Sequence, residues 1–166
     1  MHAINRVERS KIRIEADEVT YNLHIIIRYE LERDLFADKI SLDELPQVWN
    51  QKYADCLGVK VEDDSEGVMQ DTHWSSGLYG YFPSYALGNI YSGQITEALT
   101  RDLPNWRSQL SEGNLSEFNL WLKEKIHRQG DLQDPEDLIK QATGKNLNSE
   151  PYLQYLTRKY GELYGF

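Results

Sequence analysis

The chain has few of the features that mark exported, membrane or nucleic-acid-binding proteins. One cysteine in 166 residues, Cys56, excludes an internal disulfide and a thiolate metal cluster, and this is typical of a reducing cytoplasm. No apolar run approaches the roughly 18 residues of a membrane span, and no apolar N-terminal segment precedes a cleavage site. Lys and Arg number 18 against 27 Asp and Glu, so the charge of −9 opposes phosphate binding. We expect a cytoplasmic protein without nucleic-acid or membrane partners.

What the chain does contain is helical periodicity. Hydrophobic residues make up 40% of the sequence, enough for a core, and neither repeats nor flexible linkers interrupt it. Apolar residues at four-residue spacing predict an all-α fold, arranged as a single unit over residues 1–166. The predicted helices cover residues 19–35, 41–58, 87–99, 114–130, 134–144 and 149–163. Alternation around Ile12 and Ile14 in residues 11–16 also allows one short strand.

Local signals add detail to three of these predictions. Ser41 and Glu44 have the spacing of a capping box, which satisfies free backbone amides at a helix start. Cys56, in the same predicted helix, is interpreted as a core residue. In the helix before it, His24, Arg28 and Glu32 recur every fourth residue, which we interpret as a ladder on the helix surface rather than a proton relay.

A catalytic zinc site requires clustered nitrogen and oxygen ligands, most often two histidines four residues apart beside a glutamate. The four histidines of this chain are His2, His24, His73 and His127, and no two of them share a helical turn. Asp71 and His73 could share an ion, but no further donor is clustered with them. The sequence therefore predicts no metal ligand in this chain.

The most unusual segment, residues 66–89, reads EGVMQDTHWSSGLYGYFPSYALGN. Its aromatic and hydroxyl side chains lie among glycines, which allow close approach and unusual turns. Tyrosine and histidine can donate hydrogen bonds to a tetrahedral oxyanion, so this segment could form a wall of an active site. Aromatic turns of this kind also commonly pack a core. The pattern leaves both interpretations open.

Arg13 lies between two isoleucines in the segment predicted to be extended. A guanidinium held rigidly there could bind a carboxylate through two parallel hydrogen bonds, as recognition of a peptide C-terminus requires. The alternative is an ordinary ion pair with a neighbouring acid, namely Glu15, Asp17 or Glu18. Both interpretations stay open on the residues alone.

Two blocks of sequence, residues 12–17 (IRIEAD) and 67–74 (GVMQDTHW), occur together in this chain. They resemble two signature blocks of the carboxypeptidase Taq family of zinc metallocarboxypeptidases. The flanking sequences VTYNLHIIIRYELERDLF, HWSSGLYGYFPSYALGN and KYGELYG are also similar to that family, so the resemblance covers nearly the whole chain. It implies a helical, neurolysin-like metallopeptidase that removes single residues from peptide C-termini, commonly as a homodimer.

The resemblance also assigns roles to individual residues. It implies that Arg13 holds the terminal carboxylate of the substrate and that Asp17 orients Arg13 or its neighbours. It implies that His73 and Tyr81, with Tyr85 as a second choice, donate hydrogen bonds to the tetrahedral intermediate. The supporting residues would be Gln70 and Asp71, beside His73.

The resemblance further implies that the chain is the C-terminal portion of such an enzyme. The HExxH histidines, their glutamate and the third zinc ligand of the family would lie upstream, in an N-terminal catalytic part that is missing here. We expect this chain to be inactive alone, because nothing in it activates water. The alternative is a noncatalytic helical module derived from the family, in which the former groove or an uncovered apolar face binds a protein partner.

Overall fold

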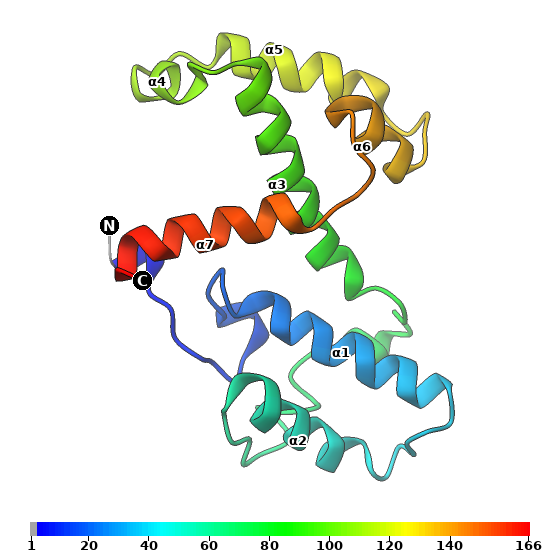
Figure 1. The fold of residues 1–166 in the computed structure, drawn as a ribbon. Coiled ribbons are helices and arrows are strands. Elements are labelled where there is room, and N and C mark those ends of the chain that lie inside the picture. The colour runs from blue at the N-terminus through cyan, green and yellow to red at the C-terminus, as the bar shows by residue number, and fades with distance from the viewer. Residues whose placement is uncertain (1–2) are drawn as a thin grey trace. The chain divides into compact units, whose positions relative to one another are not determined.

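The computed structural model describes residues 3–166, a range that contains helices and turns but no strand. The α-helices are α1 (Tyr21–Phe36), α2 (Leu45–Leu57), α3 (Pro83–Asp102), α4 (Trp106–Ser111), α5 (Ser116–Lys125), α6 (Pro135–Thr143) and α7 (Glu150–Tyr164) (Figure 1). Single 3-10 turns are η1 (Ala3–Asn5), η2 (Arg13–Glu15), η3 (Trp74–Ser76) and η4 (His127–Gln129). The prediction of an all-α fold is confirmed. None of the helices in this range combines the length and the apolarity needed to cross a bilayer.

The short strand allowed for residues 11–16 is wrong. Ile12 and Ala16 have extended backbone angles, but between them the chain makes the 3-10 turn η2, closed by a bond from the Ala16 N–H to the Arg13 carbonyl. The Arg13 N–H donates to the side chain of Gln70, at 2.9 Å, instead of to a neighbouring strand. A strand requires a partner strand, and residues 3–166 provide none.

Contacts along the chain group it into two compact units, Met1–Ala86 and Leu87–Phe166, called here the first unit and the second unit. The prediction of one unit over residues 1–166 remains a prediction.

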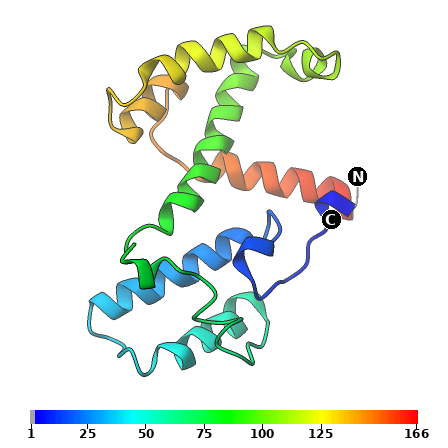
Figure 2. The same cartoon turned by 180° about the vertical axis from the view of Figure 1, so that it is seen from behind.

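In the first unit, α1 and α2 lie side by side in both views (Figures 1 and 2). Their apolar stripes form one core, whose buried members are Ile27, Leu31, Leu45, Trp49, Tyr53, Leu57 and Val61. The predicted capping box precedes α2, since the Ser41 N–H donates to Glu44 Oε2 at 2.9 Å and the Glu44 N–H donates to Ser41 Oγ at 3.3 Å. Gly58 ends α2 in the left-handed conformation.

Cys56 is exposed, so its interpretation as a core residue is wrong. The buried stripe of α2 recurs every four residues, and with 3.6 residues per turn it drifts by about 40° at each step. At Leu57, the last residue of the stripe, the buried side of the helix has rotated away from Cys56.

The second unit is built around α3 from Leu87 onward, and the first turn of α7 lies beside this helix in both views (Figures 1 and 2). Gly93 makes this close approach possible, because a Cβ there would lie 2.7 Å from the Cα of Tyr152. Ala98, Leu99 and Trp121 form a separate buried cluster of this unit.

Candidate active site

Two arginine side chains from separate elements of the first unit meet at one carboxylate. Asp71, in the loop between α2 and η3, accepts bonds on Oδ1 from Arg13 Nε at 3.0 Å and Arg13 Nη2 at 2.7 Å. Its Oδ2 accepts a bond from Arg28 Nε of α1 at 2.6 Å. Arg13 is 7% exposed and Arg28 is fully buried. In this group, the Arg13–Asp71–Arg28 cluster, two positively charged guanidinium groups share one negatively charged carboxylate.

The two arginines keep Asp71 ionised. Burial by itself would raise the pKa of this carboxyl, but the hydrogen bonds from Arg13 and the charge of Arg28 outweigh burial and hold the pKa below its ordinary value. The carboxylate therefore stays charged at neutral pH and fixes both guanidinium groups.

Arg28 is held from several sides. Its Nη1 donates to the carbonyl of His24 at 2.8 Å and to the hydroxyl of Tyr53 at 3.0 Å, and its Cζ lies 4.7 Å from the ring centre of Trp49. Burial, helped by the charge of Arg28, lowers the pKa of His24 to about 4, so His24 is neutral. The predicted surface ladder is wrong, because His24, Arg28 and Glu32 are all buried.

Further bonds fix Arg13 in its turn. Gln70 accepts the Arg13 backbone N–H and donates its own amide to the carbonyls of Lys11, at 3.0 Å, and Glu66, at 2.8 Å. Arg13 Nη1 donates to the hydroxyl of Tyr21 at 3.1 Å. Gln70 thus orients the backbone of Arg13, while Asp71 orients its side chain.

Asp17 caps the turn that leads into α1. Its Oδ1 accepts the N–H groups of Val19, at 2.9 Å, and Thr20, at 3.0 Å, and its Oδ2 accepts the N–H of Glu8 at 2.9 Å. Asp17 therefore fixes the backbone downstream of Arg13, and the ion-pair partner of Arg13 is Asp71 rather than Asp17 or a neighbouring glutamate.

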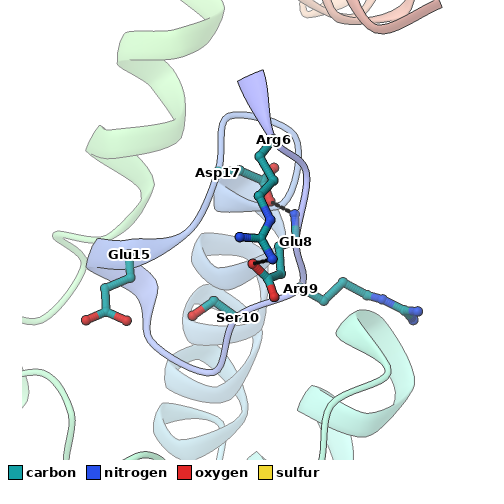
Figure 3. Close-up of a pocket in the computed structure, with 6 residues that line it drawn as sticks. All are labelled: Arg6, Glu8, Arg9, Ser10, Glu15 and Asp17. Carbon is teal, nitrogen blue, oxygen red and sulfur yellow. Dashed lines mark hydrogen bonds and ion pairs between the residues drawn. The ribbon is translucent and has the colours of Figure 1, made fainter. Parts of the chain in front are cut away.

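A pocket opens beside this turn (Figure 3). Among the predicted site residues, Asp17 lines it, and an ion pair at 2.8 Å joins Arg6 to Glu8 at its edge. The lining residues are Arg6, Glu8, Arg9, Ser10, Glu15 and Asp17. The Arg13–Asp71–Arg28 cluster is not part of this lining.

The predicted oxyanion residues lie together. His73 Nε2 is 3.0 Å from the hydroxyl of Tyr85, and the rings of His73 and Tyr81 have centres 5.6 Å apart. Arg13 Cζ lies 5.0 Å from the ring centre of Tyr85, so Tyr85 contacts both Arg13 and His73. His73 Nδ1 is 3.9 Å from Asp71 Oδ1, beyond hydrogen-bonding distance. Tyr81, 45% exposed, is the most accessible of the three.

A family model described as Carboxypeptidase Taq (M32) metallopeptidase matches residues 1–160. The chain belongs to this family. It is 48% identical over 164 residues to "Carboxypeptidase 1" of Bacillus subtilis, covering 99% of the chain and 33% of that protein. It is 45% identical to "Thermostable carboxypeptidase 1" of Thermus thermophilus, covering 98% of the chain and 32% of that protein. The chain thus spans about a third of the length of these family members.

Solved structures of the family agree in fold. The M32 carboxypeptidase from Deinococcus radiodurans matches 99% of the chain with a TM-score of 0.96 at 42% identity, over 33% of its own length. Metallocarboxypeptidase 1 of Trypanosoma cruzi matches 96% of the chain with a TM-score of 0.92 at 40% identity, over 32% of its own length. The wider relation to neurolysin-like folds remains a prediction.

A metallopeptidase family implies a metal ion, and the side chains described here do not fit one. Residues 3–166 contain no group of three His, Cys, Asp or Glu side chains placed to hold an ion. The ring of His24 is buried against Tyr53, and that of His73 lies against Tyr85. His2 lies outside the described residues.

Sequence reasoning missed Arg28 and Glu32, and their spacing contained the signal. The stripe of Ile27 and Leu31 marks one edge of a buried helix face that is at least about 100° wide. Arg28 and Glu32 each lie one residue, about 100°, from a stripe position, within reach of such a face. Polar residues there predict a buried polar network when they have partners, and the partner Asp71 is distant in sequence.

Proposed function

We propose that this chain is one part of a zinc-dependent carboxypeptidase that removes single residues from peptide C-termini. Its family supports metal-dependent peptide hydrolysis, and the similar proteins of Bacillus subtilis and Thermus thermophilus are named carboxypeptidases. Because the chain spans about a third of their length, the metal ligands would come from the upstream catalytic part. The chain alone would then be inactive, and its cellular compartment would be the cytoplasm.

The observation that carries the proposal is the Arg13–Asp71–Arg28 cluster. A single Asp–Arg pair would be neutral, but the second arginine leaves this group with one excess positive charge. Among the described residues, three of the five N–H groups of Arg13 donate to Asp71 and Tyr21. The other two would bind the terminal carboxylate of the substrate, for which a rigid guanidinium is geometrically suited.

The neighbouring aromatic residues would bind the tetrahedral intermediate. The hydroxyl of Tyr81 is the accessible donor, while His73 and Tyr85 share a hydrogen bond that one of them would exchange for substrate. Asp71 and Gln70 would act as supports, since both bond Arg13 and Asp71 lies beside His73. Asp17 would support the same site through the backbone that follows Arg13.

The test compares this chain with a chimaera in which it replaces the matching third of Bacillus subtilis carboxypeptidase 1. Both proteins are assayed with added zinc or cobalt on a short peptide with a blocked N-terminus. We expect only the chimaera to be active. Within the chimaera, Arg13→Lys and Tyr81→Phe should each lower kcat/KM by about 100-fold. Tyr79→Phe is the matched control, because Tyr79 is also exposed and packs on Phe36. Cleavage by the chain alone, or full activity of both variants, would refute the proposal.

Exposed apolar side chains favour association of the isolated chain. Four large apolar side chains of the first unit are about two-thirds exposed or more, namely Ile14 at 77%, Phe36 at 67%, Leu42 at 76% and Met69 at 73%. We propose that the chain dimerises or binds a protein partner through such side chains, as a homodimeric enzyme or a noncatalytic module would. Light scattering at high concentration should report a dimer. A strictly monomeric chain would contradict this, and an inactive chimaera that still binds zinc would favour the noncatalytic module.

A further inference from the structure

The buried carboxylate of Glu32, on α1, bonds two points of the loop that separates His73 from Tyr81. Its Oε2 accepts the indole N–H of Trp74 at 2.9 Å, and its Oε1 accepts the backbone N–H of Gly80. Trp74 directly follows His73, and Gly80 directly precedes Tyr81. One side chain on a rigid helix therefore holds both ends of this loop.

We propose that Glu32 is a positioning residue that sets the distance between His73 and Tyr81. This rests on the proposed function, in which these two residues face the reacting carbonyl. Between its ends the loop is exposed, and it turns through Gly77 and Gly80 in the left-handed conformation, at φ of 74° and 71°. Backbone bonds from the N–H groups of Ser76 and Leu78 to the His73 carbonyl close the first part of this loop, whereas the N–H of Gly80 at its other end donates to Glu32. Glycine has the greatest backbone freedom, so the position of the Gly80 end depends on that bond. The ring centres of His73 and Tyr81 lie 5.6 Å apart.

The chemistry of the contact requires a carboxylate. Both partners of Glu32 are N–H donors, so each oxygen must accept. A glutamine of the same shape has one accepting oxygen and one donating amide, and it can satisfy only one of the two. Glu32 is 8% exposed, and these two bonds offset the cost of burying its polar side chain.

Trp74 transmits the restraint to the core. Its ring contacts Trp49 edge-on, with centres 6.2 Å apart, and Phe82 edge-on, with centres 5.9 Å apart. The carboxylate fixes the rotation of this indole, and the indole fixes the backbone beside His73. Movement at either end of the loop would alter the geometry of the two oxyanion donors, and displacements of about 1 Å can cost about 100-fold in rate.

The test compares Glu32→Gln with Glu30→Gln, a control on the same helix whose carboxylate pairs with Lys52 at 2.7 Å nearer the surface. The first measurement is hydrogen exchange of the Gly80 amide and of the Trp74 indole N–H in this chain. We expect exchange of one of these two groups to be at least about tenfold faster in Glu32→Gln and both to be unchanged in Glu30→Gln, because glutamine leaves one of the two donors without an acceptor.

The second measurement uses the metal-loaded chimaera. Glu32→Gln should lower kcat by about tenfold or more while KM stays within about twofold, since the substrate carboxylate still meets Arg13. Adding Trp74→Phe removes one donor, so the single oxygen of the glutamine can turn to Gly80. The double variant should then recover part of kcat relative to Glu32→Gln, because the Gly80 end is held again while the Trp74 end is not. A loss of general stability would not produce this recovery.

The outcomes separate this inference from the proposed function. If Arg13→Lys and Tyr81→Phe lower activity but Glu32→Gln leaves kcat unchanged, the positioning role is wrong and the proposed function stands. If Tyr81→Phe has no effect while Arg13→Lys lowers activity, the oxyanion role of Tyr81 is wrong, and with it the catalytic purpose of Glu32. If neither variant lowers activity, the proposed function is wrong. If the chimaera is inactive, hydrogen exchange tests the inference by itself. Unchanged rates for both the Gly80 amide and the Trp74 indole N–H in Glu32→Gln would overturn it.

Discussion

The two units bury polar side chains of different kinds. In the second unit, Gln94 and Thr143 are fully buried polar residues. The amide of Gln94 donates to the Asn146 carbonyl at 2.9 Å, and its oxygen accepts the Asn148 N–H at 3.0 Å. These bonds tie α3 to the segment between α6 and α7. They are neutral bonds to backbone groups, as a purely structural connection requires.

The first unit instead buries charges. Arg13, Arg28 and Glu32 are each less than a tenth exposed. Both arginines donate to Asp71, and Glu32 accepts the indole N–H of Trp74. Within the described residues, His24 Nε2 and His73 Nδ1 are buried without a hydrogen-bond partner. Burying charges and leaving polar atoms unsatisfied costs stability, and proteins concentrate such costs at functional sites. The difference between the units places the candidate site in the first.

The largest effect is expected from removing the shared carboxylate. Asp71→Asn leaves two buried arginines without a counter-charge, so we expect the free energy of unfolding to fall by about 3–5 kcal/mol in urea. The control in the second unit is Asp102→Asn, where the carboxylate accepts Trp121 Nε1 at 3.0 Å near the surface. We expect it to cost about 1 kcal/mol. Equal losses would remove the distinction between the units.

Acid should destabilise the first unit through His24. Its pKa is lowered to about 4 in the folded chain, against an ordinary value of 6.5 once the chain unfolds, so the unfolded chain binds a proton first as pH falls. Stability should fall by about 3 kcal/mol between pH 6.5 and 4. Asp71, whose pKa is also lowered, adds a further loss below pH 3.8.

Tryptophan fluorescence can assign this loss. Trp106→Phe with Trp121→Phe leaves Trp49 and Trp74 to report on the first unit. In that background, His24→Gln should flatten the dependence of stability on pH between 6.5 and 4. A slope that persists would show that another group causes it.

Removing either of two glutamine side chains should lower the unfolding free energy by an intermediate amount, but only one of the two changes should affect KM. Gln94→Ala in the second unit and Gln70→Ala in the first each leave buried backbone groups unsatisfied, so each should cost about 1–3 kcal/mol in unfolding free energy. Gln70→Ala should also raise KM in the chimaera, because Gln70 orients Arg13, whereas Gln94→Ala should leave KM unchanged. A rise in KM for both would mean that the two networks have the same role.

The smallest effect is expected from surface ion pairs, which do not distinguish the units. Lys52→Met breaks the pair with Glu30 in the first unit, and Lys145→Met breaks the pair with Glu97, at 2.9 Å, in the second. Each should change the unfolding free energy by less than about 1 kcal/mol and lose that effect at high salt. A larger change in one unit would show that its surface charges are coupled to its core.

Local signals predicted most of the fold, and long-range pairing limited the prediction of the site. The stripe through Ile27 predicted α1, and Ser41 with Glu44 predicted the approach to α2, because caps and helix faces depend on residues a few positions apart. Asp71, the partner of Arg13, lies 58 residues further along the chain, and helical spacing does not predict a contact at that separation. Acidic residues nearer in sequence carry the same charge, so the sequence could not distinguish them from Asp71. The spacing of Arg28 and Glu32 is compatible with a buried helix face, but their partners Asp71, Trp74 and Gly80 are also distant in sequence, so periodicity could not identify those bonds. The residues grouped by family resemblance, His73, Tyr81 and Tyr85, do lie together.

The most direct test of the central claim, that the Arg13–Asp71–Arg28 cluster receives a terminal carboxylate, is the specificity of the metal-loaded chimaera. It compares kcat/KM for one blocked peptide ending in a free carboxylate and for the same peptide ending in an amide. We expect the parent chimaera to prefer the carboxylate by about 100-fold or more, and Arg13→Lys to lose most of that preference, because lysine lacks the planar fork. If Arg13→Lys folds with an unchanged Tm and keeps the full preference for the carboxylate, the cluster does not bind the substrate terminus and the account is wrong.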